Sequence, residues 1–152
     1  METAAGVLVR EARTDSAMTQ RALAEAVGLR QSNIAAIEAG TRPISAEKLE
    51  RLLSAADYRP SLALARHADE LIDLGMRYGV RDLRVFGSVA RGDDHHSSDI
   101  DLLVDVDADR SYLDIGAFAS HAQELLGFPV DVVIDSGGRP GMEHIRATAV
   151  AL

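Results

Sequence analysis

Apolar residues in the first sixty positions recur at the three-to-four-residue spacing of amphipathic helices, and short polar stretches separate the apolar groups. Thr19 and Ser45 each stand directly before such a group, where a helix N-cap is expected. Gly28 and Gly40 follow the second and third groups, where helices commonly end. The pattern therefore predicts four short helices, which lie in VLVREAR, TQRALAEAVG, LRQSNIAAIEAG and TRPISAEKLERLLSAA.

The pattern changes after the turn-like stretch DYRPS, in which Pro60 can start a new helix. A long helix is predicted next, and Gly79 ends it. Three strand-like stretches follow in VRDLRVFGS, DIDLLVDVD and FPVDVVIDS, with a helix in SYLDIGAFASHAQELLG and a short final helix in RPGMEHIRATAVAL. The buried faces of the two longer helices are expected to include Leu62, Ala65, Ala68, Leu71, Ile72 and Met76 in one, and Leu113, Phe118 and Leu125 in the other.

These elements predict an α+β chain with two domains. An all-α domain is expected at residues 1–60, and a small α/β domain with a mixed sheet at residues 61–152. The charge supports the division, because residues 1–60 hold eight basic and eight acidic side chains, whereas residues 61–152 hold eight basic and sixteen acidic ones. The whole net charge of −8 therefore belongs to the second part, which needs cations if it handles phosphates.

Composition excludes several classes of protein. Apolar residues make up 47% of the chain and charged residues 26%, as in globular proteins. The absence of cysteine excludes disulfides and thiolate metal sites, and it fits the cytoplasm. Neither a signal peptide nor an apolar run of the roughly 18 residues that span a membrane is visible, so no membrane partner is expected.

A helix, a tight glycine turn and a second helix form the pattern of a helix-turn-helix. The stretch TQRALAEAVGLRQSNIAAIEAGTRPIS, within residues 5–58, resembles the Cro/CI-type (Xre) repressor domain. That family pairs an arginine of its first helix with the glutamate of Glu-x-Gly, so the resemblance implies an Arg13–Glu38 ion pair. The positions that match the family are Gln20, Leu23, Ala24, Gly28, Ile34, Glu38 and Gly40.

A helix-turn-helix places the start of its recognition helix at base edges in the major groove, commonly as a dimer on two half-sites. The side chains expected there can form bidentate hydrogen bonds with adenine or guanine. Other polar side chains are expected to hold phosphates. Because this part has no net charge, a docking or dimerisation module without DNA is the alternative. The expected base contacts are Arg30, Gln31, Ser32 and Asn33, and the expected phosphate contacts are Gln20 and Arg42.

Two aspartates at the start of a strand carry the candidate chemistry of the second part. The two-residue period of a strand places Asp99 and Asp101 on one face, and Asp131 lies on a later strand. Carboxylates gathered on one face repel one another, and divalent cations offset that cost. Oxygen ligands suit Mg²⁺, and a pair of metal ions can activate an attacking oxygen and stabilise a leaving group. The turn at Gly87 and Ser88 offers backbone amides to a phosphate.

This order of motifs resembles the minimal nucleotidyltransferase family of the polymerase-beta-like superfamily, from about residue 62 onward. The family signature is Gly-Ser, about ten residues, Asp-x-Asp and a third aspartate on a later strand. The stretch GSVARG also matches the family's Gly-Ser-x-x-Arg-Gly. The resemblance implies nucleotide binding by Gly87, Ser88 and Arg91, and catalysis with two Mg²⁺ ions held by Asp99, Asp101 and Asp131. For Arg91, fixing the loop without touching phosphate is the alternative role.

Relatives of this family are antitoxins that move AMP from ATP onto a tyrosine of a HEPN-type toxin. The resemblance therefore implies a cytoplasmic, antitoxin-like protein adenylyltransferase that also binds its operator, as a homodimer or as a hetero-oligomer with its toxin. The alternative is a transcriptional regulator whose nucleotidyltransferase fold binds nucleotide or toxin without catalysis. Modification of tRNA ends or of a small molecule is a third hypothesis.

Other polar residues near the motif are expected to be solvated. His95 and His96 lie beside Asp93 and Asp94 in a loop without an evident further set of zinc ligands, so a solvated loop is favoured over a zinc site. Asp105, Asp107 and Asp109 are likewise expected to face solvent.

Overall fold

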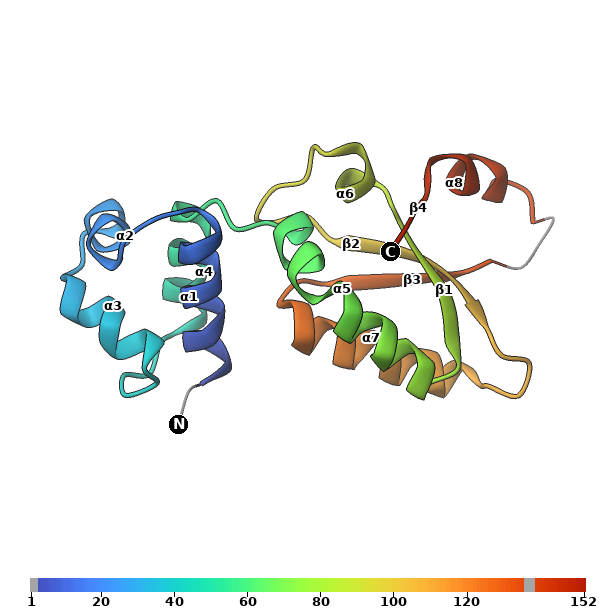
Figure 1. The fold of residues 1–152 in the computed structure, drawn as a ribbon, viewed down its shortest axis with the longest axis horizontal. Coiled ribbons are helices and arrows are strands. Elements are labelled where there is room, and N and C mark those ends of the chain that lie inside the picture. Colours follow the sequence, from blue (N-terminus) through green and yellow to red (C-terminus); the bar gives the residue numbers. More distant parts are fainter. Residues whose placement is uncertain (1–2, 136–138) are drawn as a thin grey trace. The chain divides into compact units, whose positions relative to one another are not determined.

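The computed structural model describes residues 3–135 and 139–152. The chain forms two compact units, Met1–Tyr58 and Arg59–Leu152 (Figure 1). Within the described residues, no helix combines the length and the apolarity that a bilayer crossing requires.

The first unit consists of four helices. Their starts follow from side-chain caps, because Thr3, Thr19 and Ser45 each accept a hydrogen bond from a backbone amide of the first turn. Gly28 ends the second helix in the left-handed conformation, with φ of 71°. The helices are α1 (Ala4–Asp15), α2 (Gln20–Val27), α3 (Gln31–Glu38) and α4 (Ala46–Ala55).

Apolar side chains from all four helices form the core of this unit. Glu38 is a charged exception, since only 3% of its surface is exposed. Its carboxylate accepts a hydrogen bond from Nε of Arg13 at 2.7 Å, which confirms the ion pair that the sequence predicts. The buried apolar residues are Val9, Ala12, Leu23, Ala24, Ile34, Ile37, Leu52, Ala56 and Tyr58.

The second unit is a four-stranded mixed sheet with helices on both faces. The strand order is β3-β2-β1-β4, in which β2 and β3 run parallel and β1 is antiparallel to both of its neighbours. Helices α5 and α7 cover one face, while α6 and α8 lie on the other (Figure 1). The elements are α5 (Pro60–Arg77), β1 (Val80–Phe86), α6 (Ser88–Arg91), β2 (Ile100–Val106), α7 (Tyr112–Leu126), β3 (Val130–Ile134), α8 (Met142–Thr148) and β4 (Val150–Ala151).

The predicted buried face of α5 is partly wrong. Leu71 is buried as expected, but Ala65 is exposed and Met76 is 62% exposed. The helix is kinked at His67, where φ is −113° and ψ is 18°, so one helical period cannot describe both halves. The buried face instead includes Ala63, Leu64, Leu71 and Gly75.

The expectation for α7 also fails at one end. Phe118 is fully buried, but Leu113 is 85% exposed because it belongs to the first turn of the helix. The strand β2 is buried on both faces at its centre, where Leu102, Leu103 and Val104 have no exposed surface. The sheet is therefore tightly packed next to the aspartates, which lie near the starts of β2 and β3.

Candidate active site

The turn between β1 and α6 requires glycine. Gly87 has φ of 73° and ψ of −148°, a conformation that is essentially restricted to glycine. A Cβ atom at this position would lie 2.3 Å from Oδ2 of Asp101. The turn therefore brings bare backbone against a carboxylate, and leaves space there that a side chain would fill. Because α6 has only four residues, its helix dipole is small, and the backbone amides of the turn are the groups available to bind a phosphate.

Two carboxylates lie side by side near this turn, and a third lies just before the same strand. Asp101 and Asp131 are direct partners in the parallel pairing of β2 with β3, so their side chains share one face. Asp99 directly precedes β2 and is exposed. Burial raises the pKa of the Asp101 carboxyl above its usual value, and the charges of Asp131 and Asp99 raise it further, while Arg91 opposes the shift. The structure thus places Asp101 beside Asp131 and against Gly87, while Asp99 and Arg91 lie near enough to influence its charge.

The two remaining residues of the predicted nucleotide site lie on α6. Ser88 is the first residue of this helix and is half-buried. Arg91 is its last residue, and its exposed guanidinium lies 3.3 Å from a carboxylate oxygen of Asp93. Both residues therefore belong to the short helix on the side of the sheet away from α5 and α7 (Figure 1).

The donor set fits Mg²⁺ in its chemistry. All three groups are carboxylates, which suit a hard cation that keeps waters and bridges to phosphates. In residues 3–135 and 139–152, no three His, Asp or Glu side chains form a group that could hold a metal ion as they stand.

A second acidic pair on the same face has a different environment. Asp105 lies two strand periods beyond Asp101, and Asp135 directly follows β3. Arg84 reaches both, with its guanidinium nitrogens 3.3 Å from Asp105 and 3.1 Å from Asp135, and Arg146 of α8 also bonds Asp135. Asp105 therefore combines an ion pair, which the sequence does not predict, with a side chain that stays 39% exposed. Two arginines neutralise this second pair, whereas Asp101 forms no ion pair with another described residue.

The raised pKa of Asp101 predicts a measurable cost to stability. Because the folded chain holds this proton more tightly than the unfolded chain, its contribution to stability falls as pH rises through the carboxyl range. Asp101→Asn is expected to raise the melting temperature in EDTA at pH 7 by a few degrees. At pH 3.5 the two proteins should melt alike. An equal gain at both pH values would contradict the prediction, and calorimetry makes the comparison.

Asp94 departs from the sequence prediction. The loop after α6 is expected to be solvated, and His95 is exposed, but only 6% of the Asp94 surface is exposed. Its Oδ2 accepts a hydrogen bond from the backbone N–H of Ser61 at 2.8 Å. Because these residues lie far apart in the sequence, local spacing gives no signal of this contact.

In the first unit, the predicted DNA contacts surround the start of α3. Arg30, Gln31 and Ser32 are exposed, and Asn33 is half-buried. Nη1 of Arg42 donates a hydrogen bond to Oδ1 of Asn33 at 2.7 Å. The residue predicted to hold a phosphate, Arg42, is therefore bonded to a residue predicted to contact bases, Asn33.

Gln20 joins this surface to the buried ion pair. Its amide donates to Glu38 at 2.8 Å and accepts from Gln31 at 2.7 Å. Burial would raise the pKa of the Glu38 carboxyl, but hydrogen bonds from Arg13 and Gln20 and the charges of Arg13 and Arg10 lower it below its usual value. The carboxylate therefore stays charged, and it fixes Gln20 at the start of α2.

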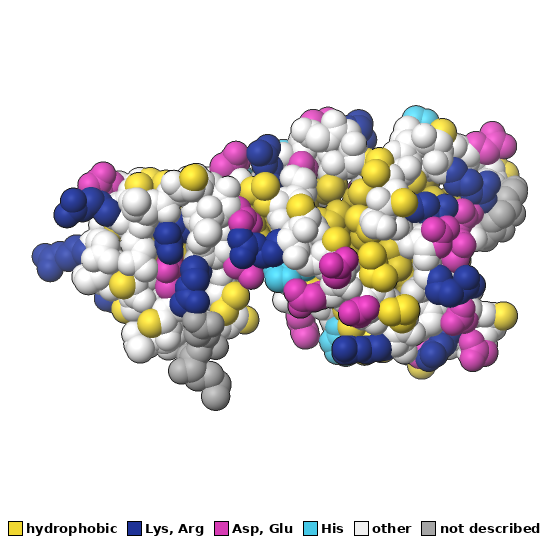
Figure 2. Space-filling model, in the orientation of Figure 1, with side chains coloured by type: hydrophobic (Ala, Val, Ile, Leu, Met, Phe, Trp, Pro, Cys, Tyr) yellow, Lys and Arg dark blue, Asp and Glu magenta, His cyan; other side chains and the backbone are white. Residues whose placement is uncertain are grey.

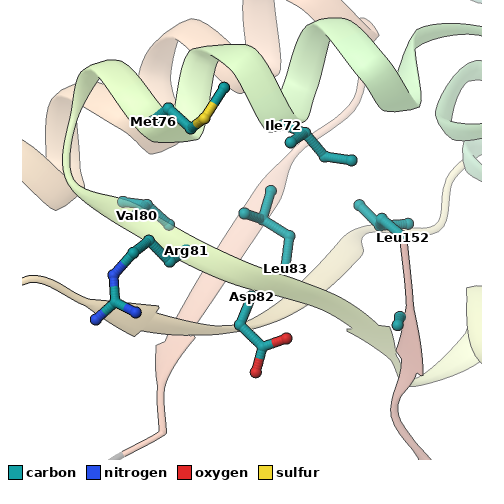
Figure 3. A pocket seen from close by; sticks show the side chains of 8 residues that line it. Ile72, Met76, Val80, Arg81, Asp82, Leu83 and Leu152 are labelled. Carbon is teal, nitrogen blue, oxygen red and sulfur yellow. The ribbon is translucent and has the colours of Figure 1, made fainter.

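A separate apolar groove of about 280 Å³ lies between α5, the start of β1 and the last residues of the chain (Figure 3). Hydrophobic side chains gather on this side of the second unit, with charged side chains around them (Figure 2). None of the predicted site residues lines the groove, since Gly87 follows the opposite end of β1. Its lining residues are Ile72, Met76, Val80, Arg81, Asp82, Leu83, Ala151 and Leu152.

Comparisons with known proteins support both halves of the chain. A family model described as a nucleotidyltransferase domain matches residues 64–148, and a helix-turn-helix model matches residues 9–62. The protein adenylyltransferase MntA of Thermococcus cleftensis is 38% identical over 79 residues, which are 52% of this chain and 77% of that protein.

Two further relatives agree with these matches. A protein of Methanocaldococcus jannaschii, provisionally named a protein adenylyltransferase, is 36% identical over 64 residues, 42% of this chain and 69% of its own length. A solved structure provisionally described as a minimal nucleotidyltransferase has a TM-score of 0.57 and 34% identity, and the match covers 62% of this chain and 98% of that one. The chain therefore belongs to the nucleotidyltransferase domain family and carries an Xre-type helix-turn-helix domain before its nucleotidyltransferase domain.

Proposed function

We propose that this chain is an antitoxin-like adenylyltransferase that moves AMP from ATP onto a partner protein. The observation that carries the proposal is the pairing of Asp101 with Asp131 across two strands, against the bare backbone of Gly87. Ion pairing does not account for these carboxylates as it does for Asp105 and Asp135. A cation and a phosphate group are the partners that would complete such a site.

Each residue of the site receives a role in this proposal. The backbone at Gly87 and the hydroxyl of Ser88 bind the terminal phosphates of ATP, and Arg91 adds positive charge from the end of α6. Asp99, Asp101 and Asp131 would hold two Mg²⁺ ions, which would supply positive charge for a reaction at the α-phosphate. Asp131, which is exposed, also accepts the proton of the acceptor hydroxyl at its carboxylate.

The reaction is an in-line displacement. The acceptor oxygen forms a bond to the α-phosphorus, while the bond from that phosphorus to the oxygen bridging the α- and β-phosphates breaks. Pyrophosphate leaves with the electron pair of that bond, and the hydroxyl proton passes to the carboxylate. The products are the adenylylated acceptor and pyrophosphate, so the main work of the chain is positioning and charge compensation.

A protein acceptor is proposed from the relatives, two of which carry adenylyltransferase names with proteins as the target. The family resemblance implies the tyrosine hydroxyl of a HEPN-type toxin as the acceptor, in an assembly of this chain with its toxin. ATP and DNA as joint partners fit a cytoplasmic protein.

The test is transfer of label to the protein encoded by the adjacent reading frame. The chain is incubated with that protein, Mg²⁺ and ATP labelled at the α-phosphate, and a parallel reaction uses ATP labelled at the γ-phosphate. Adenylyl transfer labels the partner only in the first reaction, whereas phosphoryl transfer labels it only in the second. Label on no neighbouring protein would favour the alternative, a regulator that binds nucleotide or toxin without catalysis.

The first unit is proposed to bind operator DNA and so to control the chain's own expression. Its exposed polar residues at the start of α3 offer base contacts, and the network from Glu38 through Gln20 holds Gln31 in place. The bond from Arg42 to Asn33 orients a guanidinium beside them. Arg30, Gln31, Ser32 and Asn33 are assigned to bases, and Gln20 and Arg42 to phosphates.

Gly87→Ala is expected to reduce AMP transfer at least a hundredfold. The new methyl group would collide with the Asp101 carboxylate, and the backbone conformation would cost about 1–3 kcal/mol of strain. Gly92→Ala is the matched control, because Gly92 has a similar φ of 78° but no heavy atom within 4 Å of the added Cβ. That variant should retain activity within about threefold. Equal losses in the two variants would show that the contact with Asp101 is unimportant, and steady-state rates make the comparison.

A further inference from the structure

The loop between α6 and β2 connects the Gly87 turn to Asp99, so its conformation controls how the two parts of the site face each other. Part of the loop is held by its own contacts. The N–H of His95 donates to Oγ of Ser98 at 2.9 Å, and the N–H of Ser98 donates to the His95 carbonyl at 2.9 Å. These bonds shape a turn, but they do not attach that turn to the rest of the unit.

Asp94 supplies an attachment. Its side chain is buried, and its Oδ2 accepts the hydrogen bond from the Ser61 N–H in the first turn of α5. The N-cap residue of this helix, Arg59, makes no side-chain capping bond of its own. A carboxylate from a distant loop therefore caps α5, where a negative charge also interacts favourably with the helix dipole.

The helix that Asp94 caps is a firm support. Ala63 lies two residues beyond Ser61 and has no exposed surface, and Leu64 and Leu71 are buried behind it. Helix α5 packs against both β1 and α7. The bond to Ser61 therefore joins the loop to the core of the unit.

Asp99 depends on this attachment more than Asp101 and Asp131 do. Those two lie within paired strands, which fix their positions, whereas Asp99 precedes the first residue of β2 and is exposed. The nearest fixed point toward the N-terminus is Asp94. Movement of the loop would displace Asp99 while leaving the strand aspartates in place.

We propose that Asp94 is a positioning residue for AMP transfer, which holds the loop to α5 so that Asp99 stays beside Asp101. This inference rests on the proposed function in assigning Asp99 to the metal. Asp94 itself touches neither nucleotide nor metal. Its effect should therefore appear in metal affinity and in loop order, rather than in ATP binding by the Gly87 turn.

The experiment compares Asp94→Ala with Ser61→Ala, which keeps the backbone donor, and with Asp109→Ala, which removes an equal charge at an exposed site. The readouts are the Kd for Mn²⁺ by paramagnetic resonance, hydrogen exchange of amides 95–99, and the kcat and KM for ATP. Asp94→Ala is expected to weaken Mn²⁺ binding about tenfold, to speed loop exchange at least tenfold, and to lower kcat about 10- to 100-fold with KM within threefold. Asp94→Asn, which keeps an acceptor oxygen, should restore most of each loss.

Several outcomes would overturn the proposal. The first is that Asp94→Ala has the same Mn²⁺ affinity and the same loop exchange as the controls. The second is that its loop exchanges faster while its Mn²⁺ affinity is unchanged. The third is that the unaltered chain binds no Mn²⁺. If the unaltered chain binds Mn²⁺ but transfers no AMP, the proposed function fails, while the first two readouts still decide the role of Asp94. If Asp94→Ala does not fold, Asp94→Glu, which keeps the charge but lengthens the side chain, gives the same comparison.

Discussion

Asp101→Asn is expected to lower the rate of AMP transfer by about a thousandfold or more. The carboxylate lies between Asp131 on the next strand and the bare backbone of Gly87, so it is the central group of the proposed metal and phosphate site. Asparagine has nearly the same shape but lacks the charge that holds a cation. Groups that stabilise the transferring phosphate contribute about 10³- to 10⁵-fold in rate in other phosphoryl-transfer enzymes. Single-turnover transfer with labelled ATP measures the loss.

Asp105→Asn is the matched control for this variant. Asp105 lies on the same strand and the same face, but Arg84 compensates its charge at 3.3 Å. Its removal should reduce stability by about 0.5–1.5 kcal/mol, because Arg84 loses one partner but keeps Asp135 at 3.1 Å, and transfer by the folded protein should remain within about threefold. Comparable rates for Asp101→Asn and Asp105→Asn would refute the assignment of the site to one end of the sheet.

Arg13→Met is expected to unfold or nearly unfold the first unit. Glu38 is 3% exposed and depends on this guanidinium, and an uncompensated buried carboxylate typically costs about 3–5 kcal/mol. A loss of that size approaches the whole stability of a small domain. Calorimetry should show the transition of the first unit at a much lower temperature or not at all, while the second unit melts as before.

Two further variants test the cause of this loss. Arg21→Met removes a charge from an exposed position of α2 and should change the transition little. Arg13→Met combined with Glu38→Leu removes both charges, so it should recover much of the lost stability, since apolar pairs often replace buried ion pairs at little cost. A double variant as unstable as the single one would show that packing around Arg13, and not the charge of Glu38, is the important factor.

Periodicity in the sequence predicted the order and type of the main elements, because each depends on neighbours in the chain. Thr19 and Ser45 act as the predicted caps, and the mixed sheet is confirmed. The exceptions have local causes. The kink at His67 changes which side of α5 is buried, and β4 has only two residues, too few for a strand pattern.

Contacts between residues that lie far apart in the chain leave no mark in the local sequence pattern. Sequence spacing can place Asp99 and Asp101 on one face, but only the pairing of β2 with β3 shows that Asp131 lies beside Asp101. The neutralised pair of Asp105 and Asp135 depends on Arg84 from another strand, and no local pattern marks it. The Arg13–Glu38 contact was predictable because a family resemblance carried the long-range information.

The parallel pairing of β2 with β3 also has a consequence for the order in which the protein folds. Asp101 and Asp131 lie on strands that α7 separates in the chain, so the polypeptide must complete this crossover before the two carboxylates meet. Such non-local pairing closes a long loop and tends to form late. A nascent chain can thus finish its first four helices well before Asp101 meets Asp131, so the proposed catalytic site should form after the helix-turn-helix domain.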